Sequence, residues 1–250
     1  MIVLESTEKL YGCGPTAKNR ETLGRGLFAT SLAIPDGQVV GLLGENGAGK
    51  TTLLRAAAGL VCLTGGRVLF DGQPPQAVYH QLAYMTGEGS YFPAMDPTEY
   101  AEFLARFFPR FDANRYRKLL EFFELDPRQR IEKMSTGQRA KVEVAAGMAK
   151  RAQYLLMDEP FLGKDPLTRR DFLKLLAGSL RGGETVLLAT HYLEEAEPFL
   201  DRAIILHKGR VAADLEMDAL RAAGDTLTGA LQKATGYDPQ RYLRLFADEE

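Results

Sequence analysis

The chain has 250 residues, 45% of them hydrophobic, and its formal net charge is −2. This length suits one large domain or a core with a smaller subdomain, and the weak charge argues against a nucleic-acid partner because it creates no bulk attractive field. No apolar run approaches the roughly 18 residues of a membrane span, no signal peptide is expected, and the two cysteines lack metal-ligand spacing, which favours an intracellular protein.

The first elements predicted along the chain are strands. Residues 1–10 and 27–34 have apolar side chains at alternating positions, and a turn-rich loop lies between them. Residues 38–43 are a short apolar run typical of a buried strand, and residues 52–58 are expected to be helical.

Between that strand and that helix lies the pattern G-x-x-x-x-G-K-[ST], a loop whose backbone N–H groups surround the phosphates of a nucleotide. A chance match is the alternative, and the strand and helix on either side argue against it. Lys50 is expected to reach the β- and γ-phosphates, and Thr51 to offer its hydroxyl to Mg²⁺. The residues expected to bind the nucleotide here are Gly44, Glu45, Asn46, Gly47, Ala48, Gly49, Lys50, Thr51 and Thr52.

After a short strand at 67–70, residues 91–133 combine many aromatic side chains with charges and prolines. Tyr100, Phe103, Phe107 and Phe111 follow one another at helical spacing. We interpret this region as a helical subdomain inserted into an α/β core. The aromatic stripe is expected to pack in the core, and the alternative is a docking patch for a partner helix.

A second anion-binding helix start is predicted where Ser135, Thr136, Gly137 and Gln138 open a helix that runs to residue 151. Serine is a good N-cap, and the N–H groups that follow it point outward. A single domain is not expected to need two separate binding sites for a nucleotide triphosphate. We therefore expect this helix start to complete the site of a second molecule.

Acidic and imidazole side chains follow two buried strands, where α/β folds bind ligands. Asp158 and Glu159 follow the strand 154–157; Asp158 is expected to hold Mg²⁺ and Glu159 to act as the base for the attacking water. The alternative is an acid pair that merely faces solvent. His191 follows the strand 185–189 and could contact a phosphate or that water, although a lone histidine is more often structural.

The remaining elements carry no motif. Residues 167–180 are expected to be helical, and residues 203–206 and 210–213 to form a hairpin around Lys208 and Gly209. Residues 216–250 are expected to be helical and polar.

Together these motifs resemble the ATPase domains of ABC transporters over roughly residues 1–215. The resemblance implies an α/β fold: a P-loop NTPase core with a mixed sheet flanked by helices, an N-terminal antiparallel β subdomain, and an inserted helical subdomain at about 91–150. Residues 216–250 would be a short extension. The stretches that carry the resemblance are 44–51, 134–138, 155–160, 163–165 and 189–191, which read GENGAGKT, MSTGQ, LLMDEP, GKD and ATH.

The resemblance also implies a head-to-tail pair of such domains with two molecules of ATP, and Mg²⁺, between them. Each ATP would contact the phosphate loop of one subunit and residues 135–138 of the other. Both halves occur in this chain, so a homodimer is workable and a heterodimer stays open. Tyr11 resembles the aromatic residue that stacks on adenine.

Three positions depart from the family pattern. Thr136 replaces the commoner glycine, and Lys164 stands where leucine is usual. The glutamine that usually touches Mg²⁺ and the transmembrane partner is absent: Gly87 falls on its position, and its neighbour Glu88 is the candidate metal-binding residue.

The segments 91–96 and 107–112 are similar to the helical region of bacterial ATPases that energise antibiotic, peptide or lipid exporters. The resemblance therefore implies an ATP-hydrolysing exporter subunit, peripheral on the inner face of the cell membrane, that drives a separate transmembrane permease. The main alternative is a soluble ATPase of the same fold that drives a cytoplasmic assembly process. A nucleotide-binding regulator that hydrolyses poorly is a weaker alternative.

Overall fold

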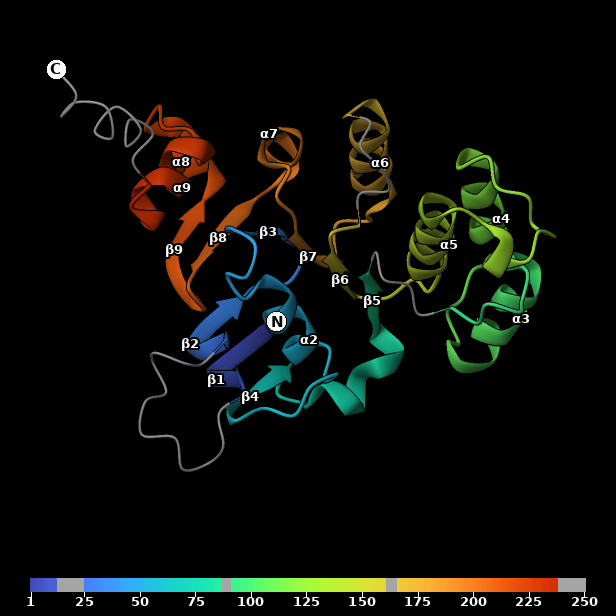
Figure 1. Cartoon of the computed structure of the whole chain (residues 1–250), viewed down its shortest axis with the longest axis horizontal. Coiled ribbons are helices and arrows are strands. Elements are labelled where there is room, and N and C mark those ends of the chain that lie inside the picture. The colour runs from blue at the N-terminus through green and yellow to red at the C-terminus, as the bar shows by residue number, and fades with distance from the viewer. Residues whose placement is uncertain (13–24, 87–90, 161–165, 238–250) are drawn as a thin grey trace, which may run out of the picture.

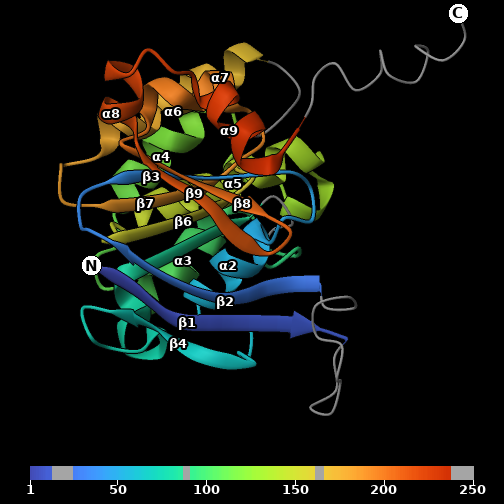
Figure 2. The ribbon, with the colours of Figure 1, turned by 90° about the vertical axis from the view of Figure 1, so that its left-hand side faces the viewer.

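A central six-stranded sheet forms the middle layer of the molecule (Figures 1 and 2). It belongs to a computed structural model that describes residues 1–12, 25–86, 91–160 and 166–237. The strand order is β5–β6–β7–β3–β8–β9, and every neighbouring pair is parallel except β8 and β9. The bounds are β3 Val39–Leu43, β5 Leu82–Thr86, β6 Tyr154–Asp158, β7 Thr185–Ala189, β8 Arg202–His207 and β9 Arg210–Glu216.

The sequence explains why these strands occupy the middle of the fold. All residues of β6 and β7 are buried, as expected for parallel strands covered on both faces. At the antiparallel edge, β8 and β9 are joined by Lys208 and Gly209, with φ angles of 48° and 77°. Two left-handed residues give a turn whose twist matches that of a hairpin. The predicted hairpin is confirmed.

A second, antiparallel sheet has the order β2–β1–β4 and lies below the central sheet in Figure 2. Helix α2 lies between the two sheets, and its apolar side chains share one core with both of them (Figure 1). The 3-10 helix η1 leads from this layer to β5. The bounds are β1 Ile2–Tyr11, β2 Arg25–Ile34, β4 Gly65–Phe70, α2 Lys50–Ala57 and η1 Pro75–Gln81.

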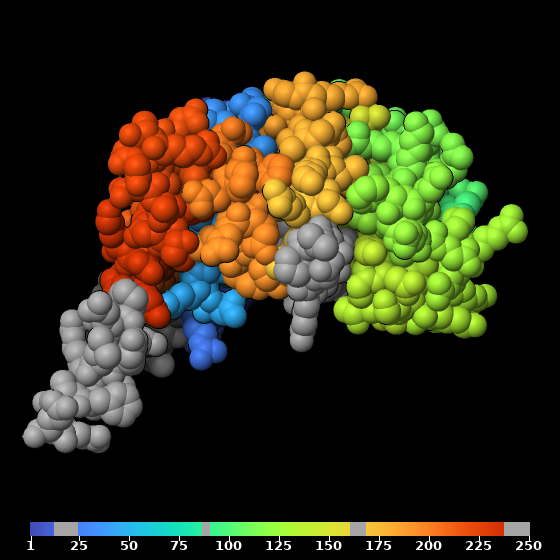
Figure 3. All heavy atoms as spheres, turned by 90° about the horizontal axis from the view of Figure 1, so that it is seen from above, coloured from blue at the N-terminus to red at the C-terminus, as the bar shows by residue number. Residues whose placement is uncertain are grey.

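Helices cover the other side of the central sheet and one of its edges. Figure 3 shows α6 and α7 between the C-terminal helices α8 and α9 at one end and the helical group α3–α5 at the other. Of the described helices, none has both the length and the apolarity to cross a bilayer. The helices are α3 Pro97–Phe107, α4 Ala113–Phe122, α5 Thr136–Ala149, α6 Pro166–Ser179, α7 Leu193–Ala196, α8 Met217–Ala222 and α9 Leu227–Thr235, with 3-10 turns η2 Ile131–Lys133 and η3 Glu197–Phe199.

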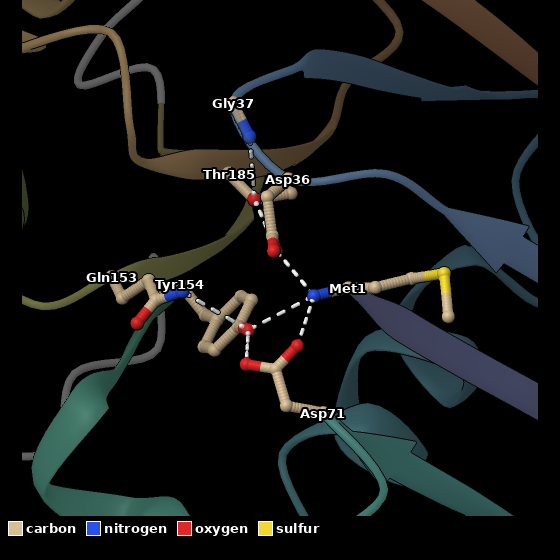
Figure 4. Close-up of polar contacts among 7 residues, drawn as sticks. All are labelled: Met1, Asp36, Gly37, Asp71, Gln153, Tyr154 and Thr185. Carbon is tan, nitrogen blue, oxygen red and sulfur yellow. Dashed lines mark hydrogen bonds and ion pairs between the residues drawn. The ribbon is translucent and has the colours of Figure 1, made fainter.

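Polar contacts join the antiparallel sheet to the beginnings of the central strands (Figure 4). The hydroxyl of Tyr154, at the start of β6, donates to Asp71 Oδ2 at 2.6 Å. The amino group of Met1 contacts Asp36, Asp71 Oδ1 at 2.6 Å, and the Tyr154 hydroxyl at 3.2 Å. These contacts fix the two sheets against each other at the end of the molecule remote from the phosphate loop.

The predicted aromatic stripe is only partly correct. Helix α3 ends at Phe107, because Pro109 cannot continue it, and Phe111 therefore lies beyond the helix. Tyr100 is buried, whereas Phe107 is 62% exposed. Phe103 stacks against both Phe107 and Phe92, with ring centroids 4.9 and 4.7 Å apart. Phe103 and Phe111 are partly buried and pack against the core. Of the four residues of the stripe, only Phe107 is exposed.

Candidate functional site

A cavity of about 570 Å³ opens at the start of α2, between the antiparallel sheet and the central sheet. It lies where the parallel strands end, the usual ligand position in such sheets. The aromatic ring of Tyr11, 41% exposed, contributes to its wall. Its lining residues are Tyr11, Arg25, Gly26, Asn46, Gly47, Gly49, Lys50, Thr51, Thr52 and Glu159.

The phosphate loop, residues 44–51, has a backbone that only its glycines permit. Gly44 has a φ of 143°, and a Cβ atom there would lie 2.2 Å from the carbonyl oxygen of Leu206. The tip of the β8–β9 hairpin braces the loop from outside, because the N–H of Gly209 donates to the carbonyl of Ala48 at 3.0 Å. The loop therefore runs into helix α2 with its first N–H groups free to meet an anion.

Lys50 is the first residue of α2 and is 6% exposed. Its ammonium donates to the carbonyl oxygens of Gly44 at 2.7 Å and Glu45 at 3.2 Å. Burial lowers the pKa of Lys50, and the nearby carboxylates of Glu159 and Asp158 act in the opposite direction. The side chain is thus a buried cation held over the loop, which is the arrangement that a polyphosphate needs.

Asp158, at the end of β6, is held on both of its oxygens. Oδ1 accepts a hydrogen bond from the Thr51 hydroxyl at 3.0 Å, and Oδ2 accepts one from Tyr84 at 3.1 Å. Tyr84 lies on β5, next to β6, and also hydrogen-bonds Arg55 of α2. Burial and the charge of Asp158 raise the pKa of Tyr84 to about 12, so its hydroxyl stays protonated and can donate. Sequence reasoning missed Tyr84 because a tyrosine in an apolar strand reads as core.

Glu159 and His191 are brought together from neighbouring strands. Glu159 Oε2 lies 2.9 Å from His191 Nδ1. Glu159 has a φ of 49°, a conformation that is uncommon for a residue with a side chain and that clusters at functional sites. Its N–H donates to the carbonyl of Ala189 at 3.0 Å, which holds this turn against the end of β7. The acid–imidazole pair therefore sits at the cavity edge.

The helix start at residues 135–138 is formed as the sequence predicts. Ser135 Oγ accepts from the N–H of Gln138 at 3.2 Å, and Gln138 Oε1 accepts from the N–H of Ser135 at 2.9 Å, which is a capping box. Ser135 and Thr136 are exposed. None of these residues lines the cavity described above. They are open to another molecule rather than to the phosphate loop of their own chain.

The structure thus gathers most, but not all, of the predicted site. Asp158 and His191 do not line the cavity themselves: Asp158 contacts the lining residue Thr51, and His191 contacts the lining residue Glu159. Arg25 and Gly26 line the cavity although the sequence analysis did not predict them. Arg25 follows a stretch with no motif, so no sequence signal marks it. Gly87, Glu88 and Lys164 lie outside the described residues, and the metal-binding prediction for Glu88 stays a prediction.

Comparisons with known proteins agree with this geometry. The family model described as ABC transporter matches residues 27–162, more than half of the chain. The Nod factor export ATP-binding protein I of Cupriavidus metallidurans is 32% identical over 223 residues, which are 86% of this chain and 70% of that protein. The daunorubicin resistance ATP-binding protein DrrA2 of Streptomyces coeruleorubidus is 36% identical over 206 residues, which are 79% of this chain and 64% of that protein.

A solved ATP-binding subunit of an ABC transporter has a TM-score of 0.75 against this chain and 25% identity, covering 98% of this chain and 99% of its own. The chain belongs to the ABC transporter family: it is an ATP-binding, ATP-hydrolysing subunit of a membrane transporter. It spans about two thirds of the length of the curated relatives described above. The predicted family, fold class and ATPase activity are confirmed.

Proposed function

We propose that the chain energises an exporter: two copies bind two molecules of ATP between them and act on a separate transmembrane permease. The observation that carries the proposal is the division of the site. One cavity holds Lys50, Thr51 and Glu159, while the helix start at Ser135 is formed and exposed away from it. The names of two relatives, which refer to export and to drug resistance, support the direction.

In this proposal each side chain has a separate task. Lys50 and the phosphate-loop N–H groups bind the β- and γ-phosphates, and Tyr11 stacks on the base. Glu159 accepts the proton of the attacking water, and His191 holds Glu159 and contacts the γ-phosphate. Ser135 and the helix start behind it contact the γ-phosphate of the nucleotide on the other copy.

The chemistry of the donor set fits Mg²⁺. Mg²⁺ takes one or two carboxylates together with phosphate oxygens and waters. Thr51 and Asp158 supply a hydroxyl and a carboxylate that already lie 3.0 Å apart at the cavity. The described residues contain no group of three or more histidine, cysteine, aspartate or glutamate side chains that could hold a metal ion. When held by Thr51 and Asp158, the ion would neutralise negative charge on the phosphates.

The membrane partner would contact an aromatic cluster in which Phe92 and Phe107 are exposed and their neighbour Phe103 is partly buried. Phe92 is 46% exposed and Phe107 62%. Exposed aromatic groups of this kind mark interaction sites more often than isolated apolar residues do. This contact would place the chain at the inner face of the membrane.

The first test is a pull-down of tagged chain from detergent-solubilised native membranes, with identification of proteins that co-purify. We expect a multi-span membrane protein in stoichiometric amount. A Phe107→Ser variant should lose this protein while keeping its ATPase activity, because Phe107 lies outside the cavity. Recovery with soluble partners only would contradict the transporter proposal and favour an assembly ATPase.

A further inference from the structure

Arg169 on helix α6 is a buried charge outside the phosphate site. It is 6% exposed, although arginine is rarely buried unless it is paired. Burying a guanidinium is costly unless hydrogen bonds and an opposite charge compensate it. The residues that compensate it therefore indicate what this side chain is for.

Two partners of Arg169 come from the segment that follows β7. Its Nη2 and Nε atoms lie 2.5 and 3.2 Å from Glu195 Oε1. Its Cζ atom lies 3.9 Å from the centre of the Tyr192 ring, the distance of a close cation–π contact. Glu195 belongs to α7, and Tyr192 is the N-cap residue of that helix. Arg169 thus holds the start of α7 against α6.

The ring of Tyr192 also contacts His191. The two ring centroids are 3.9 Å apart, with 39° between the ring planes. The N–H of Tyr192 donates to Thr190 Oγ1 at 3.0 Å, which fixes the backbone between strand end and helix. His191 in turn lies 2.9 Å from Glu159. A continuous set of contacts therefore leads from α6 to the carboxylate at the cavity edge.

His191 has little else to fix it among the contacts of the described residues. Its side chain is 52% exposed, so in the absence of a neighbour its imidazole would sample several rotamers. Functional side chains need supporting contacts that lock their orientation. The flat surface of Tyr192, itself fixed by a buried arginine, meets that need.

We propose that Arg169, Tyr192 and Glu195 form a clamp that positions His191 against Glu159. The inference rests on the proposed function of His191. These three are positioning residues, because they act through His191.

The first experiment compares Tyr192→Leu and Arg169→Met with wild type in steady-state ATP hydrolysis. We expect turnover to fall about tenfold, the upper range for losing one aromatic contact, with the KM for ATP changed less than twofold. Arg170→Met is the matched control, because Arg170 is the exposed neighbour on the same helix. Equal losses in Arg169→Met and Arg170→Met, or an unchanged Tyr192→Leu, would overturn the proposal.

A double-mutant cycle shows whether the clamp acts through His191. In a His191→Ala background, Tyr192→Leu should cause no further loss of turnover. The same loss in both backgrounds would mean that Tyr192 acts independently, which contradicts the clamp. If His191→Ala alone leaves turnover unchanged, the proposed function of His191 fails, and that outcome is separate from the clamp.

Nuclear magnetic resonance tests the positioning without any activity. The chain has three histidines, so the imidazole signals of His191 can be assigned by its removal. A ring at 3.9 Å shifts these signals, and Arg169→Met should move them toward those of an unstructured histidine while His80 and His207 stay unchanged. Unchanged His191 signals in Arg169→Met would overturn the clamp, and this result does not depend on whether His191 has the proposed role in ATP hydrolysis.

Discussion

At the scale of single residues, the orientation of Asp158 depends on the hydroxyl of Tyr84 on β5, and two strands, β6 and β7, separate β5 from the strand that leads into the phosphate loop. Tyr84 donates to one carboxylate oxygen and Thr51 to the other. A carboxylate held on both oxygens is preorganised and does not need to reorient when a ligand arrives. In the proposed Mg²⁺ site, the side chain of Tyr84 would thus act through Asp158.

Removing that hydroxyl has a testable consequence. Tyr84→Phe keeps the ring but leaves Asp158 Oδ2 without this donor, so we expect the Mg²⁺ concentration for half-maximal ATPase activity to rise. Losing an outer contact to a metal-binding group costs about 10- to 100-fold in metal affinity or activity. Titration of Mg²⁺ at saturating ATP measures this concentration.

Tyr79→Phe is the matched control, because Tyr79 is an exposed tyrosine whose hydroxyl lies 3.5 Å from the carbonyl of Gly59, outside the cavity. Its Mg²⁺ dependence should equal that of wild type. Identical curves for Tyr84→Phe and wild type would show that Tyr84 does not orient Asp158.

Some residues of the site belong to patterns that can be recognised in the sequence, and others do not. Lys50 and Thr51 belong to a pattern with fixed spacing, and Asp158, Glu159 and His191 follow strands whose burial the sequence indicates. Tyr84 and Arg169 carry no such pattern. Their roles arise from contacts with residues far away in the chain, and only the fold shows these contacts.

At the scale of elements, helix α4 is fastened to the end of α5 by Asp112, the residue that also caps the start of α4. Asp112 is the N-cap of α4 and accepts the N–H of Arg115 at 2.8 Å. The same side chain pairs with Arg151, which follows α5, at 2.7 Å. The backbone N–H of Arg115 and the guanidinium of Arg151 lower the pKa of Asp112 below its ordinary value of 3.8.

This pKa shift predicts how stability changes with pH. A depressed folded-state pKa gives stabilisation that is complete above the unfolded-state pKa and is lost as the pH falls through the folded-state value. Asp112→Asn keeps a capping side chain but loses the charge, and we expect it to lower the free energy of unfolding by about 1 kcal/mol at pH 7. Asp112→Ala also loses the cap, at a further cost of about 1 kcal/mol.

Chemical denaturation at several pH values measures both effects. The difference between wild type and Asp112→Asn should shrink below about pH 4, where the unfolded-state carboxylate becomes protonated. Asn114 in the first turn of α4 provides a control, since Asn114→Ala leaves the contacts of Asp112 intact. A difference between wild type and Asp112→Asn that is constant from pH 7 to pH 3 would contradict the electrostatic origin.

Sequence patterns indicate the type of these elements better than their ends. Helix α3 stops at Phe107, and its stripe of aromatic residues divides between core and surface. The spacing alone predicts a single apolar face, because it does not show which turns of the helix the rest of the protein covers. The expected boundaries of the helical subdomain at 91–150 and of the extension at 216 stay predictions.

At the scale of the whole molecule, Ser135 is exposed and lies outside the cavity that Lys50 lines. Under the proposed function, one copy of the chain would therefore contribute two half-sites rather than one complete site. In a closed symmetric pair, each phosphate loop would meet the helix start of the other copy. The net charge of −2 is small enough that two copies do not strongly repel each other.

Mixing two inactive variants tests this arrangement. Lys50→Ala and Ser135→Arg should each abolish ATP hydrolysis when pure. A 1:1 mixture should recover about a quarter of wild-type activity, because half of the dimers are mixed and each of these has one intact composite site. Catalytic rate is measured on freshly mixed, purified chains at saturating ATP.

The same mixture made with Lys50→Ala and a Lys50→Met chain is the control. It should recover nothing, because both variants lack the same half. A mixture of Lys50→Ala and Ser135→Arg that is no more active than its components would contradict composite sites that turn over independently.

The position of β3 has a consequence for the newly made chain. Strand β3 leads into the phosphate loop, but its neighbours β7 and β8 come late: Val39 pairs with Val186, and Leu42 with Ile204. The antiparallel sheet, by contrast, needs nothing beyond Phe70. During synthesis, which proceeds from the N-terminus, that sheet can close early while β3 leaves the ribosome with two unpaired edges. Such edges attract other strands, so the nascent chain is most exposed to aggregation before β8 emerges.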